Sequence, residues 1–109
     1  MKEVTGPGSA YVRLLASAMD DKHCVDFMYD GKYRVVEVHA IGTSPKDGSF
    51  VMRGLQVAGV ASRPLPVWTL FSVNKMEVLG FMPLESQAPR EGYAQGDKQM
   101  ASIIHEIAL

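Results

Sequence analysis

The chain has 109 residues, of which 47% are hydrophobic and 21% are charged, and its formal net charge is −1. This length suits one domain with a single core, and the composition argues against disorder. The near-neutral balance excludes a strongly basic nucleic-acid surface over the whole chain, although a local basic patch is compatible with it.

The single cysteine, Cys24, excludes an internal disulfide and a cysteine zinc cluster, and its place in an apolar strand predicts a buried small hydrophobe. No segment has the ~18 apolar residues of a membrane helix, and the first residues lack the apolar run of a signal peptide. We therefore expect one cytoplasmic domain over residues 1–109 with no membrane contact.

Apolar residues at spacings of three and four predict an N-terminal helix over residues 9–22 with Ser9 as its N-cap. Its expected buried face consists of Tyr11, Leu14, Leu15, Ala18 and Met19. Asp30 and Gly31 then predict a tight hairpin between strands at residues 23–29 and 33–42. With further strands at residues 49–59, 67–73 and 76–81, the spacing predicts a small closed or half-closed antiparallel barrel over residues 24–82.

Residues 83–96 are polar and aperiodic, and they predict a connector that packs on the barrel through Pro89 and Tyr93. Residues 97–108 predict a C-terminal helix that Asp97 caps. This helix carries a stripe of Met100, Ile103, Ile104 and Ile107. The stripe either covers the core or docks on a partner, and His105 is expected to face solvent.

Arg53 lies in the strand that we expect at the centre of the sheet. Alternation places Phe50 and Met52 on one face of this strand and Arg53 on the other, between Val51 and Leu55. A guanidinium there is costly to bury without an acceptor. Arg53 therefore reaches solvent, pairs with a carboxylate, or waits in a cleft for an anion.

The sequence carries no recognisable catalytic or metal-binding motif. The three histidines are not spaced to place two ligands on one helical face. Asp20 and Asp21 are adjacent and form a poor acid and base pair, and Glu37 is expected to pair with Arg34, Arg53 or Lys75. We therefore predict no catalytic residue, no metal, no cofactor and no enzymatic activity.

A set of cationic, amide and aromatic residues on neighbouring strands predicts a binding site instead. Its members are Tyr33, Arg34, His39, Arg53, Gln56, Trp68 and Lys75, with Phe71 beside them. Such a set suits an anionic planar ligand, such as a nucleotide or a single-stranded nucleic acid. Alternatively, His39, Trp68 and Phe71 pack in the core, the cations only protect the sheet faces, and the domain serves protein–protein interaction or oligomerisation.

Three runs of this sequence resemble, in order and spacing, the WYL domain family. They are Tyr-Arg-Val-Val-Glu-Val-His-Ala-Ile-Gly at residues 33–42, Asp-Gly-Ser-Phe-Val-Met-Arg-Gly at residues 47–54, and Trp-Thr-Leu-Phe-Ser-Val-Asn-Lys-Met at residues 68–76. The resemblance covers roughly residues 25–79. It implies an Sm-like or SH3-like barrel that senses a ligand, often a nucleic acid or nucleotide, in a groove that Arg34, His39, Arg53 and Lys75 would line.

The chain departs from the family pattern at several positions. Phe50, Val51 and Met52 replace the name-giving Trp-Tyr-Leu, Val38 replaces a proline, and Ser72 replaces an arginine. The family usually regulates transcription through an attached helix-turn-helix DNA binder, which the one helix before this barrel cannot form. We therefore expect a stand-alone regulatory module that acts through self-association or through a DNA-binding protein partner.

Overall fold

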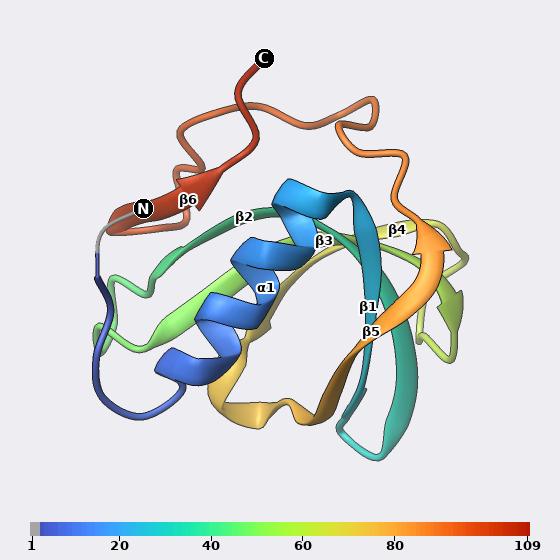
Figure 1. Cartoon of the computed structure of the whole chain (residues 1–109), viewed down its shortest axis with the longest axis horizontal. Helices are drawn as coiled ribbons and strands as arrows, with labels where there is room; N and C mark the ends of the chain where they lie inside the picture. The colour runs from blue at the N-terminus through green and yellow to red at the C-terminus, as the bar shows by residue number, and fades with distance from the viewer. Residues whose placement is uncertain (1–2) are drawn as a thin grey trace.

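The computed structural model describes residues 3–109, which form a mainly β fold with one helix (Figure 1). Six strands make an antiparallel sheet in the order β4-β3-β2-β1-β5, and β6 pairs with β2 beside this path. The sheet is not closed, so the predicted barrel is confirmed only as an antiparallel sheet. The elements are α1 Ser9–Asp21, β1 His23–Tyr29, β2 Lys32–Thr43, β3 Phe50–Gly59, β4 Val67–Ser72, the 3-10 turn η1 Val73–Lys75, β5 Glu77–Glu85 and β6 Ser102–Glu106.

Helix α1 confirms the predicted N-terminal helix and packs across one face of the sheet, here called the inner face (Figure 1). Leu15, Ala18 and Met19 are buried as predicted, whereas Tyr11 and Leu14 are half-buried at the margin of the core. The predicted cap is wrong. Ser9 is the first helical residue, and the N-cap is Gly8, which offers no side chain to the free N–H groups.

The Asp30–Gly31 hairpin is confirmed, because β1 and β2 pair up to Tyr29 opposite Lys32. Both turn residues have positive φ, 52° at Asp30 and 72° at Gly31, as a type I′ turn requires. Strand β2 is long and continues beyond β1. Its first half pairs with β1 and its second half, from Ala40, pairs with β6 along the same edge.

Strand β3 alternates as the sequence predicts, and this alternation divides the apolar side chains between two cores. Met52 packs on the inner face under α1, in a cluster that also holds Leu15, Phe27 and Phe71. Val51 packs on the opposite face, here called the outer face, with Ala40 and Met100. Helix α1 therefore covers the inner face of the sheet, and residues that follow β5 cover the outer face.

The predicted C-terminal helix over residues 97–108 is wrong, because residues 102–106 form strand β6 on the edge of β2. Ile103 joins the outer cluster and Ile104 joins the inner cluster, as adjacent residues of a strand must. β-Branched isoleucines suit this half-buried strand. The apolar stripe of Met100, Ile103, Ile104 and Ile107 thus covers both cores and leaves no free helical face for a partner.

Cys24 is fully buried, as predicted, and its thiol lies 3.8 Å from the Glu85 carbonyl oxygen. Burial raises the pKa of this thiol to about 11, so the sulfur stays protonated and unreactive at neutral pH. Within residues 3–109, no helix is long and apolar enough to cross a lipid bilayer.

Candidate functional site

The structure places the seven predicted ligand-binding residues in different parts of the fold. Arg34 is hydrogen-bonded to Gln56, and Arg53 and Trp68 line one pocket elsewhere in the fold. His39 is buried against the pocket residues Trp68 and Tyr93 and does not itself line the pocket. Tyr33 lies on the surface. Its hydroxyl donates to the Asp26 carboxylate at 2.8 Å, and this hydrogen bond raises the pKa of Tyr33. Lys75 is exposed on η1 and does not line the pocket.

Arg34 is a buried cation with neutral partners and is 9% exposed. Its guanidinium donates to the Gln56 side-chain oxygen and to the Tyr29 carbonyl, each at 3.2 Å. The same group lies 5.5 Å from the centre of the Tyr29 ring and 5.9 Å from that of Phe71. Gln56 in turn donates to the carbonyls of Ala58 and Val60. These contacts give Arg34 and Gln56 a structural role.

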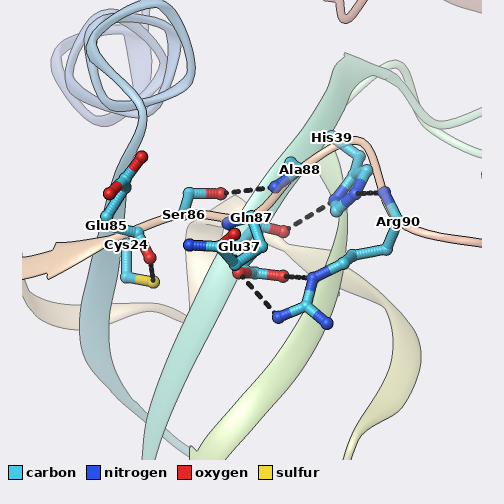
Figure 2. A network of polar contacts seen from close by, with 8 residues as sticks. All are labelled: Cys24, Glu37, His39, Glu85, Ser86, Gln87, Ala88 and Arg90. Atoms are coloured by element: carbon cyan, nitrogen blue, oxygen red, sulfur yellow. Dashed lines mark hydrogen bonds and ion pairs between the residues drawn. The ribbon is translucent and has the colours of Figure 1, made fainter.

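His39 is fully buried and has partners at both ring nitrogens (Figure 2). Its Nδ1 lies 2.9 Å from the Glu37 carbonyl oxygen, and its Nε2 accepts the Arg90 backbone N–H at 3.1 Å. Nδ1 therefore carries the proton. Burial lowers the pKa of His39, and the bond to the Glu37 carbonyl offsets only part of that effect. The packed alternative for His39 is thus the one that the contacts support.

The expected pairing of Glu37 with Arg34, Arg53 or Lys75 is wrong, because Glu37 pairs with Arg90 (Figure 2). Arg90 Nε lies 2.9 Å from Oε1 of Glu37, and Arg90 Nη2 donates to Oε2 at 3.2 Å. The Gln87 backbone N–H also donates to Oε2, at 2.6 Å. The buried acid Glu37 therefore holds residues 86–90 on the outer face. Of the two predicted anchors of the connector, Tyr93 is half-buried and bonded, whereas Pro89 is exposed.

Arg53 is paired with a carboxylate, which is one of the three outcomes expected from its sequence context. Its Nε lies 2.7 Å from Oδ2 of Asp97, and its Nη2 donates to Oδ1 at 3.3 Å and to the Gln99 side chain. These bonds hold the pKa of Asp97 below its usual value. Asp97 thus anchors the 92–98 segment on β3, instead of capping a helix.

Beside this ion pair lies an open pocket of about 430 Å³, here called the Arg53 pocket, lined by Arg53, Trp68 and residues 92–98. Trp68 is held edge-to-face against His39, with ring centres 4.6 Å apart. Gly92 has a φ of 95°, and a Cβ there would lie 2.9 Å from Trp68 Nε1. Only glycine therefore lets this segment approach the indole so closely.

Residues 92–96 of the predicted connector and Asp97 and Lys98 of the predicted C-terminal helix supply the part of the pocket that the sequence does not predict. Lys98 brings a second cation, and the Tyr93 ring lies against His39 at a tilt of 50°, with ring centres 5.2 Å apart. The Tyr93 hydroxyl donates to the Ile107 carbonyl at 2.6 Å, and burial raises its pKa to about 12. Charge is the one available signal, since Glu37 and Arg53 in apolar strands each require an opposite charge elsewhere in the chain.

The Arg53 pocket brings charged groups and an aromatic ring together. Arg53 and Lys98 contribute two positive charges against the one negative charge of Asp97, and Trp68 offers an aromatic surface beside them. Within the described part of the chain, no group of three or more His, Cys, Asp or Glu side chains could hold a metal ion.

No protein-family model, no curated protein and no solved structure matches this chain. The resemblance to the WYL family therefore stays a prediction that rests on the three sequence runs alone.

Proposed function

We propose that this chain is a non-enzymatic ligand-sensing domain that binds an anionic, planar ligand in the Arg53 pocket. The ligand class is a nucleotide, free or as one unit of a single-stranded nucleic acid. The observation that carries the proposal is the meeting of Arg53, Lys98 and Trp68 around one open pocket. Cations beside an indole suit phosphate and base together, through charge-assisted hydrogen bonds and stacking.

The size of the pocket and the free donors support this ligand class. About 430 Å³ falls in the range of ~300–1,000 Å³ usual for small-molecule sites. Asp97 and Gln99 engage Nε and Nη2 of Arg53, and the Nη1 group has no hydrogen-bond partner among residues 3–109. Nη1 and the Lys98 ammonium are thus the donors that we assign to the anionic group.

The order of the strands supports the finer assignment to an Sm-like or SH3-like small barrel of the WYL type. An N-terminal helix precedes five strands in the order β4-β3-β2-β1-β5, and a 3-10 turn joins β4 to β5. In this proposal the 92–98 segment transmits ligand occupancy, because it forms the pocket wall and continues into β6. The regulated partner would then contact the C-terminal part of the chain.

The test uses Trp68, the single tryptophan, as a fluorescent reporter in the pocket. Adenosine and guanosine monophosphates and a short oligothymidylate are titrated at low salt into wild type, Arg53→Met, Lys98→Met and Arg13→Met. We expect saturable quenching by wild type and by Arg13→Met, whose exposed side chain donates to the Val4 carbonyl and does not line the pocket. Each pocket variant should bind about tenfold more weakly or worse, which is a loss of ~1.4 kcal/mol or more.

Salt supplies an independent check, because contacts to phosphate weaken steeply as the salt concentration rises. Absence of saturable quenching at low salt contradicts the proposal. Equal binding by wild type and Lys98→Met contradicts it too, and Lys98 is exposed, so this variant should fold normally.

A further inference from the structure

Strand β5 ends the sheet on the side opposite to β4 and carries several exposed apolar side chains. Among the described strands it pairs only with β1. Val78 is 80% exposed, Phe81 is 49% exposed and Leu84 is 46% exposed. Burying such side chains against a partner is favourable, and an exposed apolar strip rimmed by charges is typical of a docking surface.

Next to this strip the surface is hollowed where α1 ends and β1 begins. The hollow has a volume of about 380 Å³ and is lined by Asp21, His23, Phe81, Met82 and Pro83; we call it the β5 hollow. The His23 and Phe81 rings meet edge-to-face, with centres 6.1 Å apart. The β5 hollow shares no lining residue with the Arg53 pocket, so the two are separate sites.

The charged side chains of β5 itself are negative, and the cation nearest the hollow in the sequence is the exposed Lys22. Asp21 lines the hollow, and the Asp26 carboxylate lies 3.2 Å from the Cβ position of Gly80. Glu77 and Glu85 lie at the two ends of the strand, which contains no lysine or arginine. None of these four carboxylates takes part in an ion pair within residues 3–109. A cationic partner would therefore meet unpaired acids on both sides of an apolar patch.

The backbone of β5 is poorly suited to accept another strand. Its pairing with β1 has two register irregularities, Pro83 lacks an N–H, and Val78 has a φ of 54°, which is strained for a β-branched residue. Irregular edges of this kind disfavour strand addition. A partner must therefore dock through the side chains of the strip and the hollow.

We propose that the β5 hollow and its flanking acids bind a short cationic segment of a partner protein. An apolar side chain of that segment enters the hollow against Phe81 and Met82, and lysine or arginine residues on either side of it pair with Asp21 and Glu85. This site is independent of the nucleotide pocket, so it gives the module a protein-binding face whatever the Arg53 pocket holds.

The experiment is an amide chemical-shift titration of the full chain, which detects weak binding and locates it. The probe is the acetylated peptide Gly-Ser-Lys-Leu-Lys-Ser-Gly, and its counterpart carries glutamate in place of both lysines. With the lysine peptide we expect saturable shifts confined to the end of α1, the start of β1 and β5. The glutamate peptide should cause none.

Two variants test the assigned contacts, and both change exposed residues. Phe81→Ser and Asp21→Asn should each weaken binding of the lysine peptide, Phe81→Ser by about tenfold because it removes the central apolar contact. The matched controls are Val60→Ser, an equally exposed apolar residue outside the hollow, and Glu91→Gln, an exposed acid outside it. Both controls should bind the lysine peptide as wild type does.

Three results would overturn the proposal. The first is an absence of saturable shifts with the lysine peptide at low salt. The second is equal binding of the glutamate peptide. The third is a set of shifts at β5 that follows protein concentration without any peptide, which would assign the strip to contact with a second copy of this chain.

Discussion

Glu37 carries a negative charge to the outer face of the sheet, where it is 1% exposed. A carboxylate in that position is tolerated only with a counter-charge and with donors for its oxygens. Arg90 and the Gln87 N–H supply them from a segment about 50 residues further along the chain. This acid therefore decides where residues 86–90 can lie, and Arg90 has a structural role.

Arg90→Ala should destabilise the chain because it leaves Glu37 buried without its counter-charge. Breaking a fully buried pair costs ~3–5 kcal/mol. We expect about 2 kcal/mol here, since the Arg90 side chain is 38% exposed and water already screens part of the interaction. Urea unfolding measures the difference. The control, Arg13→Ala, removes an exposed arginine and should change the unfolding free energy by less than ~0.5 kcal/mol.

A double variant tests the cause of that loss. Glu37→Gln removes the buried charge, so in the Arg90→Ala background it should restore part of the lost stability. An additive effect, or an Arg90→Ala variant as stable as Arg13→Ala, would show that the ion pair does not hold the segment.

His39 makes the stability of the fold depend on pH. Burial depresses the pKa of His39 in the folded chain, whereas the unfolded chain has an ordinary value near 6.5. Below about 6.5 the unfolded state binds more protons than the folded state, so stability is lost as the pH falls from this value through the folded pKa. Above the unfolded pKa the contribution of His39 is fully present.

Urea unfolding between about pH 7.5 and pH 5.5 measures this slope. The background carries His23→Asn and His105→Asn, so that His39 is the remaining histidine. We expect the unfolding free energy to fall with pH in this background and to change much less when His39→Gln is added. The same slope in both proteins would mean that His39 is not responsible.

At the scale of the residue, the sequence predicts on which face of the sheet a side chain lies better than it predicts which residue that side chain pairs with. Alternation places Arg53 opposite Met52, and the structure confirms it. The acid that pairs with Arg53 and the cation that pairs with Glu37 could not be assigned, because Arg90 comes from a connector without periodicity and Asp97 from a segment predicted as a helix. Pairing across such a distance depends on the path of the chain, which no local pattern encodes.

Among the elements, β6 shows how an apolar stripe can indicate the wrong period. Isoleucines at residues 103, 104 and 107 fit a helical face, yet they equally fit a strand that contributes to cores on both sides. Strand β2 extends beyond β1, and the backbone groups on that edge need hydrogen-bond partners. Residues 102–106 therefore form a strand that pairs with this edge, not a helix. The hairpin at residues 30–31 was predictable because its signal is local.

Gly42 allows β6 to approach β2. A Cβ at Gly42 would lie 2.3 Å from the Ser102 carbonyl oxygen and 2.5 Å from the Met100 sulfur. Gly42→Ala should therefore displace β6 and cost more than about 2 kcal/mol, as strain in a packed core does. Amide exchange should rise in residues 102–106. Its control, Gly48→Ala, meets nothing within 4 Å and should cost only the ~1 kcal/mol of its positive φ.

Should Gly42→Ala cost no more than Gly48→Ala and leave exchange in β6 unchanged, the close pairing of β6 with β2 would be refuted. This outcome would also favour the predicted helix over residues 97–108 instead of strand β6.

Asp97 bonds to part of the Arg53 guanidinium, which the proposed ligand would also bind. Asp97→Asn weakens this internal contact and removes the negative charge from the Arg53 pocket. We therefore expect nucleotide affinity, measured by Trp68 quenching, to increase several-fold, and amide exchange in residues 92–98 to rise. The exposed neighbour Glu91 supplies the control, because Glu91→Gln changes the net charge equally without touching Arg53. Weaker binding by Asp97→Asn would show that the Asp97 carboxylate shapes the pocket for the ligand.

At the scale of the whole molecule, one sheet carries two cores of unequal size. Among residues 3–109, the inner core comprises fourteen buried hydrophobic residues of α1 and the strands and turn it packs on, and the outer core comprises three, covered by residues that follow β5. Composition and alternation predict the inner core and the mainly β class. The outer core could not be predicted, because the sequence predicts a connector and a helix for the residues that cover it, and no local pattern specifies their path over the sheet. The pocket belongs to this less predictable side.

The difference in size between the two cores predicts that the molecule unfolds in two steps, in which the outer core opens before the inner core. Leu15 is fully buried in the inner core, so Leu15→Ala should cost ~2–5 kcal/mol and lower amide protection throughout the chain. Met100 is buried in the small outer cluster. Met100→Ala should lower protection mainly in residues 92–106 and leave α1 nearly unchanged, because local openings need break only the contacts of that segment.

Native-state hydrogen exchange at increasing urea distinguishes the two behaviours, since global opening exposes more surface and depends more steeply on urea. If Met100→Ala lowers protection equally in α1 and in residues 92–106, the two cores open as one unit. The pocket wall could then not move without unfolding the sheet. A selective loss in residues 92–106 instead means that the wall of the Arg53 pocket opens while the inner core stays closed, which is the freedom that a ligand-sensing segment requires.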